Sequence, residues 1–272
     1  MPETEQQPAA VPQQNPAVSV LGNRIATVGA FGVGKDYVLK RYGYTILGFA
    51  DPLYAIAAYA FGTADKSLPG MREFLQTIGQ WGRGTVSEQY PLTVQRATFV
   101  PARILMRGNP VVENMRADLT KRFHVDWKQW GTPDIWVDAL ARRIAASPKT
   151  ARIAVSNVRF GNELTKLRAA GLDAWLVAST PAELKERRKA AGLSERGSGD
   201  TSEVLAKSLG RAVASADGVL HYSNDGDALA EGPVTNYISG VIWNSNELDL
   251  AKYVRPGVPV FRMPRGSEEN PS

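Results

Sequence analysis

Short apolar runs alternate along the chain with longer segments whose apolar residues recur at helical spacing. The apolar runs, which we expect to form strands, are 24–28, 44–49, 152–156, 173–177 and 219–222. The segments of helical spacing are 36–42, 53–61, 70–81, 134–144, 162–170 and 181–191. Strands that alternate with helices in this way predict an α/β fold with a mostly parallel sheet, right-handed crossovers and flanking helices.

This alternation covers only part of the sequence. Residues 1–20 are rich in Pro and Gln and poor in bulky apolar side chains, so we expect a disordered tail. Residues 21–235 are predicted to form the α/β domain, and residues 236–272 a C-terminal extension. Within the domain, prolines break residues 84–133 into short pieces, which indicates an inserted subdomain or a long lid.

The composition is that of an ordinary globular protein and limits the possible classes. Of 272 residues, 43% are hydrophobic and 22% are charged. The absence of cysteine excludes disulfides and thiolate metal sites and fits a reducing cytoplasm. No run approaches the roughly 18 apolar residues of a membrane span, and the acidic, Gln/Pro-rich beginning is the opposite of a signal peptide. The net charge of +5 suggests an anionic partner.

One glycine-rich stretch connects the first predicted strand to the first predicted helix. It reads Gly29-Ala30-Phe31-Gly32-Val33-Gly34-Lys35-Asp36, which has the G-x-x-x-x-G-K spacing of a phosphate-binding loop. In such a loop the glycines let backbone N–H groups surround an anion, the helix N-terminus adds partial positive charge, and Lys35 neutralises the outer phosphates. A glycine-rich turn in a protein that binds no nucleotide is the alternative interpretation.

The residue after the lysine departs from the usual motif. A Ser or Thr hydroxyl normally ligates Mg²⁺ there, whereas this chain has Asp36, followed by Tyr37. A carboxylate is also a hard oxygen ligand for Mg²⁺, directly or through water. Asp36 is therefore the predicted metal ligand.

Two predicted helices carry polar residues beside their apolar faces or at their start. Asp51 follows the second predicted strand, and the Asp51–Pro52 pair predicts a helix start with Asp51 as the N-cap. In the helix predicted over 70–81, an apolar face is bordered by Arg72, Gln76 and Arg83.

Seven short motifs, in this order, resemble the deoxynucleoside monophosphate kinases of bacteriophages. They are the stretch 29–36, Phe49-Ala50-Asp51-Pro52-Leu53, Arg72-Glu73-Phe74-Leu75-Gln76-Thr77-Ile78-Gly79, Asp134-Ile135-Trp136-Val137, Val158-Arg159-Phe160-Gly161-Asn162-Glu163, Thr201-Ser202-Glu203 and Asn224-Asp225-Gly226. The resemblance covers residues 24–83 and 134–230. It implies a P-loop kinase fold, phosphoryl transfer from ATP with Mg²⁺, and a place in the cytoplasm of the infected bacterium.

On the ATP side, the resemblance implies that the loop holds the β- and γ-phosphates. The residues concerned are Gly29, Ala30, Phe31, Gly32, Val33, Gly34, Lys35, Asp36 and Tyr37, with Asp36 on the metal. Arg187, Arg188 and Arg196 surround a Gly/Ser-rich loop and are similar to a lid, over about 185–203, that closes over ATP. A solvated basic helix is the alternative for this segment.

On the acceptor side, the resemblance assigns Asp51 to orient the acceptor or to act as its base, with a helix N-cap alone as the alternative. Arg72, Gln76 and Arg83 are expected to bind the acceptor; solvated helix charge is the alternative for the arginines. Arg159 is expected to reach the transferring phosphoryl group and Glu163 to fix Arg159, unless the two residues form a purely structural pair.

Two features depart from the family pattern. Ser156-Asn157 stands where many relatives have an Asp, which counts against a motor or hydrolase that needs a second metal-binding carboxylate.

The second feature is the segment 84–133, which is basic and contains aromatic residues. It has seven Lys or Arg (96, 103, 107, 116, 121, 122, 128), four acidic residues (88, 113, 118, 126) and five interleaved aromatics, Tyr90, Phe99, Phe123, Trp127 and Trp130. Charge and aromatics together suit a nucleic-acid strand; a small helical cap with its own core is the alternative. His124 is interpreted as an incidental surface histidine.

The acceptor therefore has two candidate identities. One related set of phage kinases phosphorylates the hydroxyl of 5-hydroxymethyluracil in DNA, and the basic segment favours this modified-DNA acceptor because such an enzyme must hold the polymer and expose a base. A free deoxynucleoside monophosphate, converted to the diphosphate, is the alternative. A non-catalytic, nucleotide-gated DNA-binding module would need a damaged loop, yet Lys35 and the three loop glycines are present.

Overall fold

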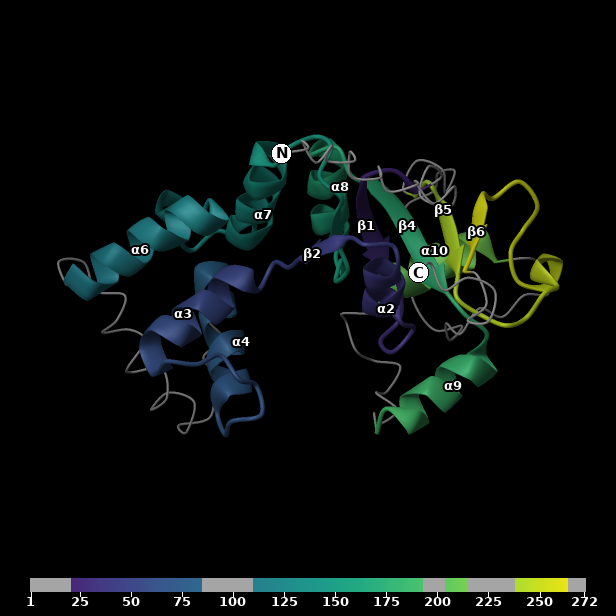
Figure 1. The fold of residues 1–272 in the computed structure, drawn as a ribbon, viewed down its shortest axis with the longest axis horizontal. Helices are drawn as coiled ribbons and strands as arrows, with labels where there is room; N and C mark the ends of the chain where they lie inside the picture. The colour runs from purple at the N-terminus through teal and green to yellow at the C-terminus, as the bar shows by residue number, and fades with distance from the viewer. Residues whose placement is uncertain (1–20, 85–109, 193–203, 215–237, 264–272) are drawn as a thin grey trace, which may run out of the picture.

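A parallel sheet and a neighbouring group of helices make up the described part of the chain (Figure 1). The computed structural model describes residues 21–84, 110–192, 204–214 and 238–263. The predicted tail, the strand expected over 219–222 and most of the expected lid lie outside these residues.

All strands of the sheet run parallel. They are β1 (Arg24–Val28), β2 (Thr45–Leu47), β3 (Ile153–Val155), β4 (Asp173–Ala178), β5 (Gly240–Trp243) and β6 (Val260–Arg262). Their order across the sheet is β2-β3-β1-β4-β5-β6, so that β1 pairs with β3 on one side and with β4 on the other. The expectation of a parallel sheet flanked by helices is therefore confirmed.

The last two strands come from the range interpreted as a C-terminal extension. β5 pairs with β4, and β6 pairs with β5, both in parallel register. Trp243 of β5 is almost fully buried. The sheet therefore continues past the predicted boundary at residue 235, and the range 236–272 contributes two of its strands.

The predicted helices are present, with ends that differ by a residue or two. They are α2 (Lys35–Arg41), α3 (Asp51–Phe61), α4 (Met71–Gly82), α7 (Ile135–Ala146), α8 (Gly161–Ala169) and α9 (Pro181–Ala190). Four helical elements were not predicted and are described: α6 (Pro110–Phe123), the short 3-10 helices η1 (Trp127–Gln129) and η4 (Leu250–Lys252), and α10 (Val204–Val213). None of the described helices is long and apolar enough to cross a membrane.

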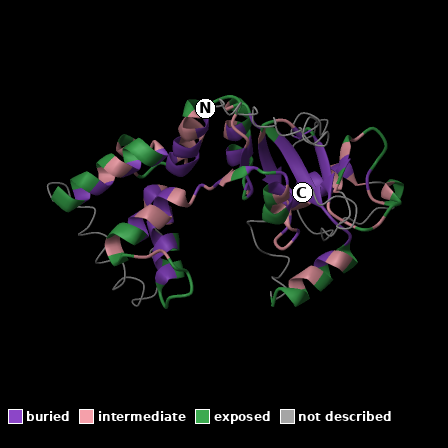
Figure 2. Ribbon diagram, in the orientation of Figure 1, coloured by how far each residue is buried: buried purple, intermediate pink, exposed green. Residues whose placement is uncertain are grey.

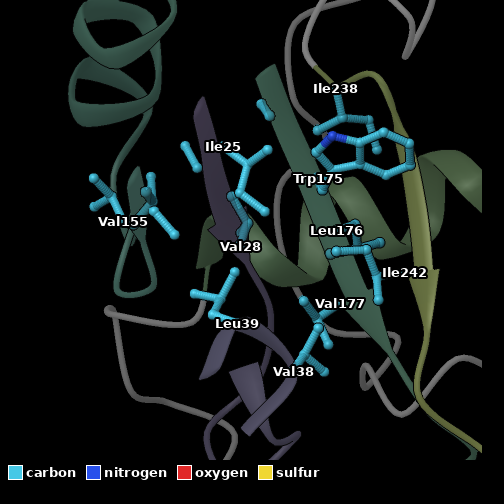
Figure 3. Close-up of a cluster of buried hydrophobic side chains, with 14 of the residues drawn as sticks. Ile25, Val28, Val38, Leu39, Val155, Trp175, Leu176, Val177, Ile238 and Ile242 are labelled. Atoms are coloured by element: carbon cyan, nitrogen blue, oxygen red, sulfur yellow. The ribbon is translucent and has the colours of Figure 1, made fainter. Parts of the chain in front are cut away.

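The centre of the sheet is buried on both faces (Figure 2). Side chains of β1 and β4, such as Ile25 and Leu176, pack with Val38 and Leu39 of α2 (Figure 3). Strands covered on both faces read as continuous apolar runs rather than alternating ones. This explains why the strands were visible in the sequence as short unbroken apolar stretches.

A second apolar core holds four helices together beside the β2 edge of the sheet (Figure 1). The helices are α3, α4, α6 and α7, and their buried side chains include Ile56, Phe74, Leu119 and Trp136. The Trp136 indole Nε1 donates to the Gly79 carbonyl of α4 at 2.9 Å. We name this group of four helices, α3, α4, α6 and α7, the helical cap. Because α6 contributes to its core, the described part of the segment 84–133 belongs to the helical cap.

The contact between α4 and α7 yields a test of the cap core. A Cβ at Gly82 would lie 2.3 Å from Cζ2 of Trp136, whose indole is almost fully buried. We therefore expect Gly82→Ala to lower the free energy of unfolding by about 1–3 kcal/mol, because the indole must shift. Gly161→Ala is the matched control, since a Cβ there meets nothing within 4 Å, and we expect a change within ~0.5 kcal/mol. Equal urea midpoints for the two variants would contradict this packing.

Candidate functional site

The glycine-rich stretch lies at the carboxyl end of β1, where it leads into α2. After β1 the chain continues to β2, which lies toward one edge of the sheet. After β4 the next strand in the chain is β5, which lies toward the opposite edge. β1 and β4 are neighbours, so their carboxyl ends form a topological switch point. Open parallel sheets bind their ligands in the crevice at such a point.

The loop backbone requires glycine where it turns. Gly32 and Gly34 have φ of 80° and 89°, which is the left-handed region that side chains rarely adopt. A Cβ at Gly34 would also lie 2.8 Å from Nδ2 of Asn244. Within the described residues, the amides of Gly32 and Gly34 donate to no acceptor. These two N–H groups are therefore available to an anion beside the N-terminus of α2.

Lys35 begins α2, and its side chain folds back over the loop. The ammonium Nζ donates to the carbonyls of Gly29 and Ala30, at 2.7 and 3.0 Å. Asp36 and Tyr37 follow in the first turn and are exposed. No group of three or more His, Asp or Glu in the described part of the chain is arranged to hold a metal ion. A Mg²⁺ ion here would need Asp36 together with phosphate oxygens and water, which is how Mg²⁺ is commonly bound.

The two arginines expected on the ATP side reach the loop from α9. Arg188 donates through Nε to the Phe31 carbonyl at 2.9 Å, and Arg187 donates to the Asn244 carbonyl at 2.6 Å. The Asn244 amide in turn donates to the Val33 carbonyl at 2.8 Å. Arg196 and the Gly/Ser-rich loop lie outside the described residues.

The sequence pattern gives no prediction for Asn244. It directly follows β5, in the range interpreted as an extension, so no strand was predicted before it. A polar residue after a buried strand is the signal that could have identified it, since such residues lie at the ligand-binding edge of a parallel sheet.

Asp51 occupies a different position from the predicted one. Ala50 is the N-cap of α3, and Asp51 is the first residue of the helix, so the predicted N-cap was wrong by one residue. Its carboxylate accepts from the Gly48 amide at 3.1 Å and pairs with Arg143 of α7 at 2.8 Å. The carboxylate thus binds a preceding amide and an arginine of another helix, and not the α3 amides that a cap would bind. Arg143 was also missed, because nothing near it in the sequence indicates a partner 92 residues away.

A buried glutamate holds the backbone after β3. Glu163 is 4% exposed, and its Oε2 accepts from the amides of Arg159 and Phe160 at 2.8 and 3.3 Å. Burial raises the pKa of Glu163, whereas these amides and the nearby positive charges of Arg83 and Arg159 lower it. The structure thus brings Arg83, from the end of α4, and Arg159 to the same carboxylate. Arg159 itself donates through Nε to the side-chain oxygen of Asn157 at 2.9 Å.

Arg72 and Gln76 lie on the exposed face of α4. Phe74, Leu75 and Ile78 are buried on the other face, as the helical spacing predicted. Among the described residues, the side chains of Arg72 and Gln76 have no hydrogen-bond or ion-pair partner, so both are accessible to a ligand.

The aromatic residues of the basic segment do not form an open stacking surface in the part that is described. Phe123 is buried in the cap core. Trp127 and Trp130 stack on each other with ring centroids 5.7 Å apart, and both pack against the same core. Tyr90 and Phe99 lie outside the described residues. Residues 110–133 therefore fit the alternative of a helical cap.

Comparison with known proteins does not assign a function to this site. No protein-family model matches the chain, and no curated protein matches it. The chemistry open to the site is set by the loop, its lysine and the arginines around it.

The raised pKa of Glu163 predicts a pH-dependent stability. Because the folded pKa lies above the ordinary one, folding favours the protonated carboxyl; this contribution is fully present below the ordinary pKa and is lost as the pH rises through the raised value. Glu163→Gln retains an acceptor oxygen but cannot ionise. We expect the stability of the wild type to fall relative to this variant as the pH rises above about 4, the ordinary pKa of a glutamate.

The measurement is urea unfolding of both proteins across this pH range. Glu186→Gln is the matched control, because Glu186 is exposed and has no ion-pair partner among the described residues. A difference between wild type and Glu163→Gln that does not change with pH would show that the buried carboxyl does not titrate as described.

Proposed function

We propose that the protein is an ATP-dependent P-loop kinase that phosphorylates a nucleotide acceptor. The observation that carries the proposal is the loop at the carboxyl end of β1. There, two glycine amides without acceptors among the described residues lie beside Lys35 and the N-terminus of α2. This arrangement suits the β- and γ-phosphates of a nucleotide.

The donor side supplies charge and alignment. The loop amides would donate to the phosphate oxygens, and Lys35 would exchange the carbonyls of Gly29 and Ala30 for them. Mg²⁺ held beside Asp36 would neutralise charge on the phosphates. In the transfer, an acceptor oxygen forms a bond to the γ-phosphorus while the bond from that phosphorus to the β–γ bridging oxygen breaks. ADP leaves with the electron pair, and Lys35 stabilises the charge that develops.

The acceptor side is cationic and close to the cap. Arg143 holds the Asp51 carboxylate at the start of α3, so that Asp51 has a fixed orientation for the acceptor. Arg83 and Arg159 form a small cationic cluster near Glu163, whereas Arg72 is exposed near the opposite end of α4. Guanidinium groups in such a cluster suit a phosphate, which they bind in a bidentate manner. The charge of the cluster therefore supports an acceptor that carries a phosphate of its own.

A free deoxynucleoside monophosphate is the acceptor that the described residues favour. Phe123, Trp127 and Trp130 are engaged in the cap, so they present no row of free rings to the bases of a strand. The modified-DNA acceptor, 5-hydroxymethyluracil, is the second candidate. It is favoured by the exposed cations Lys121 and Lys128 at the edge of the cap.

Removal of the loop lysine tests the reaction class. We expect Lys35→Ala to lower kcat by about 10²–10³-fold while the protein stays folded, because one donor to the developing charge is lost. Lys40→Ala, which removes an exposed lysine of the same helix, should leave kcat unchanged. Turnover is measured with labelled ATP, and folding by urea unfolding. A folded Lys35→Ala protein with normal turnover would remove the basis for the loop assignment.

A second experiment separates the two acceptors. Labelled ATP is offered with a panel of free deoxynucleoside monophosphates and with DNA containing hydroxymethyluracil. For a free monophosphate we expect turnover that depends little on salt and survives the triple reversal of Arg103, Arg107 and Lys121 to Glu. For DNA with about four phosphate contacts, the log–log slope of affinity against salt would be roughly −3 to −4, and the reversal would abolish transfer. The second result would establish the DNA acceptor.

A further inference from the structure

A basic groove lies on the helical cap, between α6, η1 and α7. Its volume is about 560 Å³, and the lining residues that define its chemistry are Arg116, His124, Asp126, Trp127, Lys128 and Arg142. Figure 1 places α6 and α7 on the opposite side of the molecule from α9, whose arginines contact the phosphate loop. The groove is therefore separate from the loop.

The charges that line this groove are predominantly positive. Among the lining residues there are three cations, Arg116, Lys128 and Arg142, and one acid, Asp126. Glu113, which does not line the groove, pairs with Arg116 at 3.6 Å. Asp126 is already engaged, because its Oδ1 accepts from the Lys128 amide at 3.0 Å and so begins η1. An anion that enters the groove therefore meets more positive than negative charge.

Two of the cations are held in place by the protein. Arg142 donates through Nε to the His124 carbonyl at 3.0 Å and through NH2 to the Gln129 side chain at 3.3 Å. The guanidinium of Arg116 lies 5.1 Å from the centre of the Trp127 ring. Fixed cations lose little side-chain entropy when they bind an anion, which favours binding.

The turn at His124 is the strained point of the groove. Its φ of 58° is the only positive value of a non-glycine residue in the described ranges. Such backbone costs of order 1 kcal/mol and is retained where the surrounding structure enforces it, often at ligand sites. Here the strain points the His124 carbonyl at Arg142 and thereby sets the guanidinium at the groove.

The indole of Trp127 is engaged by protein groups that line the groove, so it is not free to stack on a nucleotide base. Its Nε1 donates to the Arg116 carbonyl at 3.1 Å and to the Thr120 hydroxyl at 3.2 Å. Arg116 lies over the ring, and Trp130 stacks with it. The groove thus offers charge but little free aromatic surface, which selects for phosphate and not for a particular base.

We propose that this groove is a second anion site, which binds the phosphate group of a nucleotide, either free or within a polynucleotide strand. The site does not depend on the kinase activity. Adjacent residues of α7 serve the two regions, since Arg143 pairs with Asp51 whereas Arg142 binds the His124 carbonyl. Loss of one function therefore need not remove the other.

The test measures binding in the Lys35→Ala background, so that the phosphate loop contributes little. The probes are a fluorescein-labelled single-stranded oligothymidylate and thymidine monophosphate. Lys128→Glu reverses an exposed groove cation, and Arg116→Gln is added to it in a second variant. Lys149→Glu is the matched control, because it makes the same charge change at an exposed position outside the groove. Urea midpoints establish that each variant is folded.

We expect Lys128→Glu to weaken probe binding by about tenfold, the size of one lost charged hydrogen bond, and the double variant to weaken it further. Lys149→Glu should have little effect. Weakening for the oligothymidylate, with a log–log salt slope smaller by roughly one, identifies a polynucleotide as the source of the phosphate. Weakening for thymidine monophosphate alone identifies a free nucleotide. Absence of binding for both probes, or equal binding by groove and control variants, overturns the proposal.

Discussion

Burial of β1 between β3 and β4 is the constraint on which the rest of the structure depends. The strand has parallel partners on both sides and is covered on both faces, so its carboxyl end is fixed in space. The glycine loop leaves from that end, and α2 returns across the sheet directly after it. The anion binding proposed for this loop would benefit from such a fixed start, because each backbone dihedral that is already set lowers the entropy lost on binding.

The sheet domain could be predicted from the sequence largely because its strands are buried on both faces. Runs such as 24–28 and 173–178 are mostly apolar, and the segments between them have a clear helical period. β5 was not predicted, although its sequence Gly-Val-Ile-Trp is apolar. The prediction relied on strands that alternate with helices, and no helical segment was recognised next to β5. Its membership in the sheet depends on pairing with β4, which lies far earlier in the chain, and local pattern does not encode that contact.

In the candidate site too, local features could be predicted from the sequence, whereas contacts between distant segments could not. The loop glycines and Lys35 could be found because their chemistry depends on residues next to one another in the chain. The pair Asp51–Arg143 and the contact of Asn244 with Val33 join distant segments. Such pairs are set by how the helical cap and the C-terminal strands pack, so the sequence pattern can mark a residue such as Asn244 but does not indicate its partner. The cap itself was foreseen only as one of two alternatives for the basic segment.

The position of β5 and β6 at the end of the sheet limits how far the chain can be truncated from its C-terminal side without exposing β4. A chain that stopped near residue 235 would lose both strands and leave the backbone groups of β4 unpaired along one side. An uncovered strand of that kind is a template for association with other chains. It would also lose Asn244 from beside Val33. These two late strands therefore cover the side of β4 that would otherwise be open, and they hold Asn244 beside the loop.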